Sequence, residues 1–184
     1  KSKAAEWNGD AANLGVLGSS TGGHVAELLG MRPRDARYNA IPLPTAPNVD
    51  ATVAYVATRS PISDPYARLQ NAETLKRAAM IANHTTFFKP WETIHESNPQ
   101  EILERHEAVT LVPMLIIQGA LDDNVLPIVQ EKFAATYKAA GGNGSKPSKP
   151  HLALQADLIM DSLMLSVKAL TVVGLLIGLA AVLG

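Results

Sequence analysis

The chain has 184 residues, of which 47% are hydrophobic, and a formal net charge of −1 at pH 7. A chain of this length and composition can bury one ordinary core, and without a run of lysines or arginines we expect no nucleic-acid partner. It has no cysteine, which excludes disulfides, thiolate metal sites and a cysteine nucleophile. Its five histidines lack the paired spacing of metal ligands, so we expect neither a metal nor another cofactor.

A G-x-S-x-G motif, Gly18-Ser19-Ser20-Thr21-Gly22, is the first informative feature of the chain. The apolar run 14–17 before it is typical of a buried parallel strand, and residues 21–30 after it have apolar side chains at helical spacing. Strand, sharp turn and helix in this order predict a nucleophile elbow with Ser20 as the nucleophile. The alternative is a glycine-rich turn whose serine has no chemical role.

The residues around Ser20 have separate expected tasks. Gly18 and Gly22 should leave room for a strained turn, and Gly23 should allow the following helix to pack closely. The N-terminus of that helix would place N–H groups and a positive dipole near a developing oxyanion. His24 leaves from the body of the same helix, so we expect it either to be structural or to support the site residues from behind, and not to be the catalytic base.

Further elements alternate between strands and helices. Aromatic and proline side chains at Pro61, Phe87, Phe88 and Trp91 either line a substrate pocket or, more commonly for such clusters, belong to the core. The alternation predicts an α/β fold with a parallel sheet. The expected elements are a short helix Lys1–Trp7, a strand Asp50–Thr58, a helix Asp64–Met80, a helix Asn98–His106, a strand Val109–Gln118 and a helix Ile128–Ala140.

Two adjacent aspartates, Asp122 and Asp123, follow the last predicted strand. A carboxylate just beyond the carboxyl end of a parallel strand lies at the edge of the sheet where ligands bind. The alternative is a pair of aspartates that only cap a turn.

The segment from Trp7 to Asn143 resembles the later part of bacterial α/β-hydrolase esterases of the acetyl-esterase and feruloyl-esterase-like groups. The sequences that carry this resemblance are Leu14-Gly15-Val16-Leu17-Gly18-Ser19-Ser20-Thr21-Gly22-Gly23-His24 and Gln118-Gly119-Ala120-Leu121-Asp122-Asp123-Asn124-Val125. The resemblance implies a partial α/β-hydrolase domain over residues 1–143, with Ser20 as nucleophile. It also selects Asp122, three residues after Gly119, as the acid that orients a catalytic histidine.

The histidine is where this sequence departs from the family. A further strand and a histidine-bearing loop would follow, but residues 144–157 have the composition of a linker. His151 is the candidate base within it, and the alternative is a solvated linker histidine. The strands that support the elbow and the loop that completes the oxyanion hole are also missing, so we expect the chain alone to be inactive or incomplete.

Residues 158–184 differ in character from the rest, because Lys168 is the only charge between Leu163 and Gly184. A helix from Leu163 to Gly184 spans about 33 Å, so this segment is predicted to cross a bilayer once. Gly174 and Gly178 form a GxxxG pattern that favours packing against other transmembrane helices. The lysines before the helix predict a cytoplasmic globular part. The alternative is a helix buried in a soluble protein.

Two functional hypotheses follow from these features. The first is a membrane-anchored α/β-hydrolase-like protein related to serine carboxylesterases. The second is a non-catalytic accessory subunit whose single helix docks into a larger membrane complex. The sequence leaves open whether the chain is an enzyme.

Overall fold

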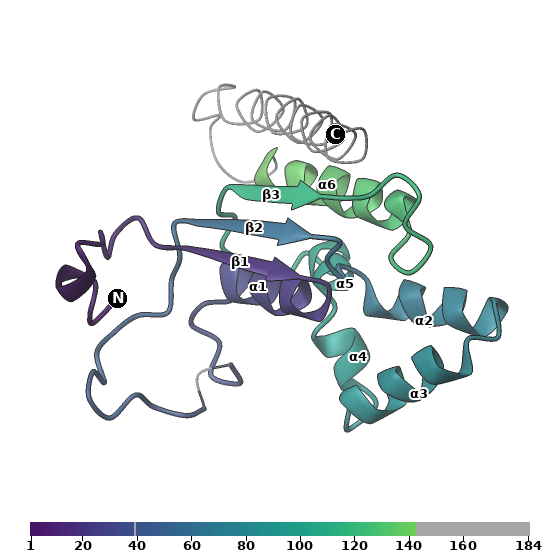
Figure 1. Cartoon of the computed structure of the whole chain (residues 1–184), viewed down its shortest axis with the longest axis horizontal. Coiled ribbons are helices and arrows are strands. Elements are labelled where there is room, and N and C mark those ends of the chain that lie inside the picture. The colour runs from purple at the N-terminus through teal and green to yellow at the C-terminus, as the bar shows by residue number, and fades with distance from the viewer. Residues whose placement is uncertain (39, 143–184) are drawn as a thin grey trace, which may run out of the picture. The chain divides into compact units, whose positions relative to one another are not determined.

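The structure is a computed structural model that describes residues 1–38 and 40–142. The predicted linker 144–157, the predicted helix 158–184 and the candidate base His151 lie outside these residues. Among the described residues, no helix is long and apolar enough to cross a membrane. In chain order (Figure 1), the elements are a 3₁₀ turn Ala5–Trp7, β1 Gly15–Ser19, α1 Thr21–Met31, β2 Tyr55–Arg59, α2 Pro65–Thr74, α3 Ala78–Phe87, α4 Thr93–Glu96, α5 Pro99–Glu104, β3 Met114–Ile117 and α6 Pro127–Gly142.

The strands form a parallel sheet in the order β1-β2-β3. The backbone N–H of Ser20 donates to the Arg59 carbonyl at 3.0 Å, and that of Ser60 donates to the Ile117 carbonyl at 2.8 Å, so the pairing continues just past the strands. Because parallel strands point the same way, the residues that follow them meet at one edge of the sheet. This sheet confirms the predicted α/β class and gathers the candidate residues at its carboxyl edge.

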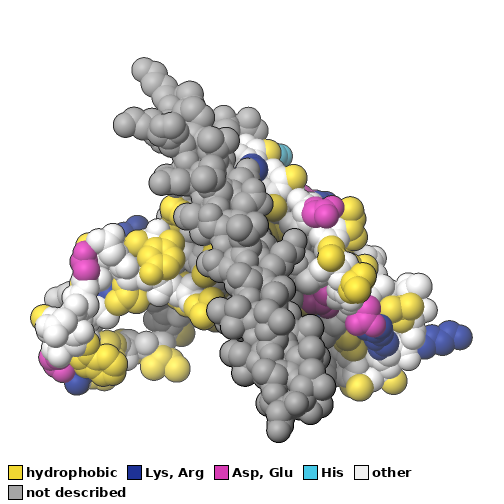
Figure 2. Space-filling view, turned by 45° about the horizontal axis from the view of Figure 1, so that its top comes forward, with side chains coloured by type: hydrophobic (Ala, Val, Ile, Leu, Met, Phe, Trp, Pro, Cys, Tyr) yellow, Lys and Arg dark blue, Asp and Glu magenta, His cyan; other side chains and the backbone are white. Residues whose placement is uncertain are grey.

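Helices pack against the face of the sheet that carries Val56 and Thr58, which are buried. A Cβ atom on Gly30 of α1 would lie 2.6 Å from a Val56 methyl carbon, which shows how closely this helix approaches β2. On the opposite face, Leu17 and Tyr55 are 76% and 50% exposed. Figure 2 shows other hydrophobic side chains at the surface. The core cluster consists of Leu28, Met31, Ile102, Leu103 and Phe133, with Met114 and Ile116 of β3 packed against it.

The helix predicted over Asp64–Met80 is broken into α2 and α3. Lys76 adopts a left-handed backbone conformation, with φ 54°, which most residues other than glycine avoid. The Arg77 N–H donates to the Ala72 carbonyl at 2.8 Å and the Lys76 N–H donates to the Glu73 carbonyl at 3.0 Å. These two bonds form a Schellman motif, which ends α2. The prediction of one helix was wrong because lysine occupies the position where glycine usually marks such an end.

Three other predicted elements are clearly shorter in the structure. The strand predicted over Val109–Gln118 is only Met114–Ile117. The N-terminal helix is a single 3₁₀ turn, which ends at Asn8 in a left-handed conformation. The strand predicted from Asp50 begins only at Tyr55. Before it, the Asp50 carboxylate accepts the Thr52 N–H at 2.6 Å, a local turn that competes with strand pairing.

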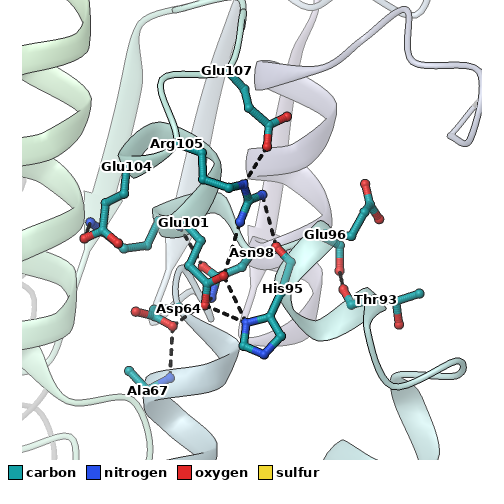
Figure 3. A network of polar contacts seen from close by, with 12 residues as sticks. Asp64, Ala67, Thr93, His95, Glu96, Asn98, Glu101, Glu104, Arg105 and Glu107 are labelled. Carbon is teal, nitrogen blue, oxygen red and sulfur yellow. Dashed lines mark hydrogen bonds and ion pairs between the residues drawn. The ribbon is translucent and has the colours of Figure 1, made fainter.

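The starts of α2 and α5 are joined by a hydrogen bond between their two capping side chains (Figure 3). Asp64 accepts the Ala67 N–H at 2.9 Å, and Asn98 accepts the Glu101 N–H at 3.1 Å, as expected of N-caps. The Asn98 amide also donates to the Asp64 carboxylate at 2.9 Å. Both caps are buried, so this contact fixes two helices that are distant in sequence.

Replacing Asn98 with aspartate should destabilise the fold at neutral pH by about 1–3 kcal/mol, because the amide donor becomes a second carboxylate beside Asp64. Urea unfolding measures the change. Acidification should restore part of the stability by protonating one of the two carboxyl groups. Asn48→Asp, at an exposed position, is the matched control. An equal, pH-independent loss in both variants would contradict this account.

A second buried network ties α1 to α6 through Ser63. The Ser63 Oγ lies 2.8 Å from a carboxyl oxygen of Glu27 and 2.7 Å from the Gln130 side-chain oxygen. The Gln130 amide nitrogen donates to the Pro61 carbonyl at 2.7 Å, and this bond sets the orientation of the amide. Since Ser63 has one hydroxyl hydrogen, which Gln130 accepts, the remaining contact requires Glu27 to donate. Glu27 is therefore a neutral carboxylic acid.

The surroundings of Glu27 favour the same protonation state. Burial is the largest influence on Glu27 and raises its pKa to about 8. Tyr137 of α6 also lies close enough to interact electrostatically with Glu27, and its hydroxyl donates to the Val112 carbonyl at 2.8 Å. The hydrogen bonds that join α1 to α6 through Ser63 thus require the proton on Glu27.

As the pH rises from 4.5 to about 8, the unchanged chain should lose stability, whereas the Glu27→Gln variant should not show this loss. In this window the folded chain keeps the Glu27 proton while the unfolded chain releases it. The free energy of unfolding should therefore fall by up to about 1.4 kcal/mol per pH unit. Glutamine cannot ionise, but its amide can still donate to Ser63.

Urea unfolding at a series of pH values measures both slopes. Glu131→Gln, at an exposed position of α6, controls for the loss of one negative charge. Identical slopes for the unchanged chain and Glu27→Gln would show that Glu27 is ionised in the folded protein.

Candidate active site

Ser20 lies between β1 and α1 with φ 53° and ψ −120°, outside the main regions allowed to residues with a side chain. It occupies the N-cap position of α1, where a serine side chain usually accepts a helix N–H. The Ser20 side chain makes no such capping bond and is exposed. The strained backbone therefore presents the hydroxyl to solvent at the carboxyl edge of the sheet.

Two of the three glycines are required by close contacts. A Cβ atom on Gly18 would lie 2.1 Å from the Gly22 carbonyl oxygen, and one on Gly23 would lie 2.7 Å from the Pro61 Cβ. The expected roles of Gly18 and Gly23 are confirmed. The expectation for Gly22 was wrong, because a Cβ there would meet nothing within 4 Å; its backbone, not its missing side chain, is what Gly18 must accommodate.

The first turn of α1 supplies hydrogen-bond donors next to Ser20. The first intrahelical bond at this end runs from the His24 N–H to the Ser20 carbonyl at 3.1 Å. The N–H groups of Thr21 and Gly22 precede it and have no acceptor within the helix. Such donors, together with the helix dipole, can stabilise negative charge that develops on an oxygen bound at Ser20.

Asp122 is held by the loop that follows β3. One of its carboxylate oxygens accepts the N–H groups of Asn124 at 3.0 Å and Val125 at 2.9 Å, and the other accepts the Gln118 amide at 3.2 Å. Burial raises the pKa of Asp122, but hydrogen bonds from Val125, Ser60, Asn124 and Gln118 outweigh it, so the pKa lies below its ordinary value. Asp122 is therefore ionised at neutral pH. The adjacent Asp123 instead forms a surface ion pair with Arg77 at 2.6 Å.

Ser20 and Asp122 follow β1 and β3, which flank β2. Two strand spacings correspond to about 10 Å, a separation that a histidine side chain between the two groups could bridge. Among the described residues, no histidine is hydrogen-bonded to either group. The structure thus brings two predicted site residues to one edge of the sheet, and the third, His151, lies outside the described residues.

The histidines of the described chain have other partners. His24 is buried on α1 with its Nε2 2.7 Å from the Ser97 carbonyl oxygen, and burial lowers its pKa. This is the structural role that the sequence indicated for it. His95 contacts Glu101 at 3.0 Å, and His84 contacts the Met80 carbonyl at 2.8 Å through Nδ1. No group of potential metal ligands is present in residues 1–38 and 40–142.

A cavity of about 570 Å³ lies beside the elbow, within the usual size range of ligand pockets. Phe87 and Phe88 line it, as one of the two sequence interpretations expected, but Phe88 also belongs to a core cluster with Leu69 and Ile94, as the other expected. Pro61 packs against Gly23, and Trp91 does not line the cavity. The sequence did not indicate Arg68 and His84, which also line the cavity, because neither belongs to a recognisable motif. The principal lining residues are Thr21, His24, Arg68, His84, Phe87 and Phe88.

A larger cavity, of about 670 Å³, lies at the opposite end of α1, near Met31 and Glu107. The arginines along it are neutralised by carboxylates, for example Arg32 by Glu96 at 3.1 Å. Since it is at the far end of the helix from Ser20, we assign the candidate active site to the smaller cavity.

Comparisons with curated proteins and with solved structures gave no match. Residues 1–136 match BD-FAE, an α/β-hydrolase-type esterase family. The matched region contains the elbow at Ser20, the loop at Asp122 and the parallel sheet that positions them. Because this match covers more than half of the chain, the protein belongs to the BD-FAE family.

Proposed function

We propose, against the expectation from the sequence that the chain alone is inactive or incomplete, that the protein is a serine carboxylesterase in which Ser20 is the nucleophile. The Ser20 Oγ attacks the ester carbonyl carbon, its proton passes to a histidine, and the alcohol leaves with that proton to give an acyl-enzyme that water hydrolyses. The N–H groups at the start of α1 stabilise the oxyanion of the intermediate. Asp122 orients the histidine and stabilises its charged form.

The observation that carries this proposal is the conformation of Ser20. A non-glycine residue at φ 53° and ψ −120° costs free energy, and the strain is expected where it serves function. An idle serine in a glycine-rich turn would be expected to cap the helix, which Ser20 does not. Membership of an esterase family supports the same chemistry.

For the base we propose His151, which follows the last helix of the hydrolase-like domain in sequence. Attachment to a membrane through residues 158–184 is a separate proposal that rests on the hydropathy of that segment. A further proposal, that Gly174 and Gly178 pack against other transmembrane helices, requires that residues 158–184 cross the membrane.

A fluorophosphonate probe should label the full chain at Ser20, because an activated serine attacks phosphorus in place of an ester carbonyl. Mass spectrometry of the digested protein locates the adduct. Ser20→Ala should abolish labelling, whereas Ser19→Ala should retain it, since Ser19 belongs to β1 and accepts a hydrogen bond from Arg59 at 3.3 Å. A correctly folded chain that is not labelled would contradict the proposal.

Asp122→Asn should slow both probe labelling and ester hydrolysis strongly, by up to about 10⁴-fold as in a Ser-His-Asp triad, because the amide no longer favours the required histidine tautomer. Initial rates of labelling and of p-nitrophenyl acetate hydrolysis measure the effect. Asp123→Asn is the matched control and should change both rates little, because that carboxylate pairs with Arg77 at the surface.

Equal effects of the two aspartate substitutions would remove Asp122 from the site. His151→Ala tests the proposed base in the same assays, with His106→Ala, at an exposed position, as its control. Full activity of His151→Ala would show that another group takes the Ser20 proton.

A further inference from the structure

Arg68 lines the cavity beside the elbow, together with Thr21, the residue that follows Ser20. It comes from α2, which lies next to α3 beyond the carboxyl ends of the strands (Figure 1). Thr21 lines the same cavity from the start of α1. A ligand that reaches Ser20 through this cavity therefore passes a guanidinium group.

The hydrogen-bond partners of Arg68 are neutral. Its Nε and Nη2 donate to the Asn124 side-chain oxygen at 3.0 and 2.7 Å. Its Nη1 lies 3.3 Å from Nε2 of His84. Because the His84 Nδ1 faces the Met80 carbonyl and must carry the proton, Nε2 accepts from Arg68 and the ring is uncharged. Burial lowers the pKa of His84, in agreement with a neutral ring.

Arg68 differs in this respect from most arginines of the chain. Within the described residues no carboxylate forms an ion pair with it, and Asp122 acts on its charge only through space. Arg68 is half-buried, so solvent compensates its charge only in part. The arginines that do pair with carboxylates are Arg32, Arg34, Arg37, Arg77 and Arg105.

A guanidinium group has five N–H donors, and the contacts with Asn124 and His84 use three of them. One N–H on each terminal nitrogen remains, and two such donors can bind both oxygens of a carboxylate. Phe87, which is 56% exposed, adds an apolar ring to the same cavity. The cavity thus combines a cation that forms no ion pair among the described residues with an aromatic surface near the nucleophile.

We propose that Arg68 binds a carboxylate of the substrate, so that the preferred substrate is an ester that carries a free carboxylate and an apolar or aromatic group. This inference rests on the proposed function of Ser20 for its reaction, but the binding of the carboxylate does not require catalysis. Arg68 determines specificity and takes no part in the bond changes.

Binding is tested on the full chain with Ser20→Ala, which cannot turn over an ester. The probes are monobenzyl succinate, which has a free carboxylate, and benzyl methyl succinate, in which that carboxylate is masked. Isothermal titration calorimetry or NMR titration gives both dissociation constants. We expect the anionic ester to bind roughly tenfold or more tightly than the neutral one, as for one hydrogen bond to a charged group.

Adding Arg68→Gln should remove this preference and leave binding of the neutral ester nearly unchanged. Arg68→Lys should retain part of the preference, because it keeps the charge but loses the planar fork. Arg59→Gln is the matched control: Arg59 also lacks a carboxylate partner in the described chain, but it contacts Ser19 and does not line the cavity. It should keep the full preference.

Equal binding of the two esters, or equal loss of preference in Arg68→Gln and Arg59→Gln, would overturn the proposal. The comparison of the two esters needs no arginine variant, so it decides the matter even where Arg68→Gln does not fold. Probe labelling of Ser20 without a preference for the anionic ester would reject this specificity and leave the esterase function intact. A preference that depends on Arg68 in a chain that no probe labels would reject the esterase function and retain the carboxylate site.

Discussion

The buried segment Pro61 to Asp64, which follows β2, is the constraint on which the arrangement of the site depends. Pro61 packs against Gly23 of α1, and its carbonyl accepts a hydrogen bond from Gln130 of α6 at 2.7 Å. The Ser63 side chain joins α1 to α6, and its carbonyl accepts the Gln100 N–H of α5 at 3.0 Å. Asp64 caps α2 and accepts from the cap of α5. Three residues of this segment therefore set the positions of α1, α2, α5 and α6.

These contacts are mostly polar and buried, which makes them specific. An unpaired polar group in the interior costs free energy, so each bond disfavours arrangements in which its partner is displaced. The proton on Glu27 belongs to this set, because a charged carboxylate would leave Ser63 without enough hydrogen atoms for its two contacts. The position of α1, and with it the turn at Ser20, is thus connected to a proton in the core.

The backbone strain at Ser20 is maintained by this framework. A conformation of this kind costs about 1–3 kcal/mol and persists only where its surroundings determine it. Here the Ser20 N–H is bound to the Arg59 carbonyl, and Gly18 lets the backbone at Gly22 approach β1. The two charged groups near the site have different partners. Asp122 accepts hydrogen bonds from several donors and stays ionised, whereas Arg68 has neutral hydrogen-bond partners and forms no ion pair among the described residues.

The sequence by itself determined the local features: the strand, turn and helix around Ser20, the caps at Asp64 and Asn98, the alternation of strands and helices, and the loop at Asp122 after the last strand. Each depends on residues close together in the chain, through glycine sterics, capping or hydrophobic periodicity. It failed at Lys76, where a left-handed residue without glycine ends α2. Only the tertiary structure decided the proton on Glu27, the contact between the two caps and the neutral partners of Arg68. Those contacts join segments far apart in sequence, and their energies depend on burial and on the count of donors and acceptors, which no local pattern records.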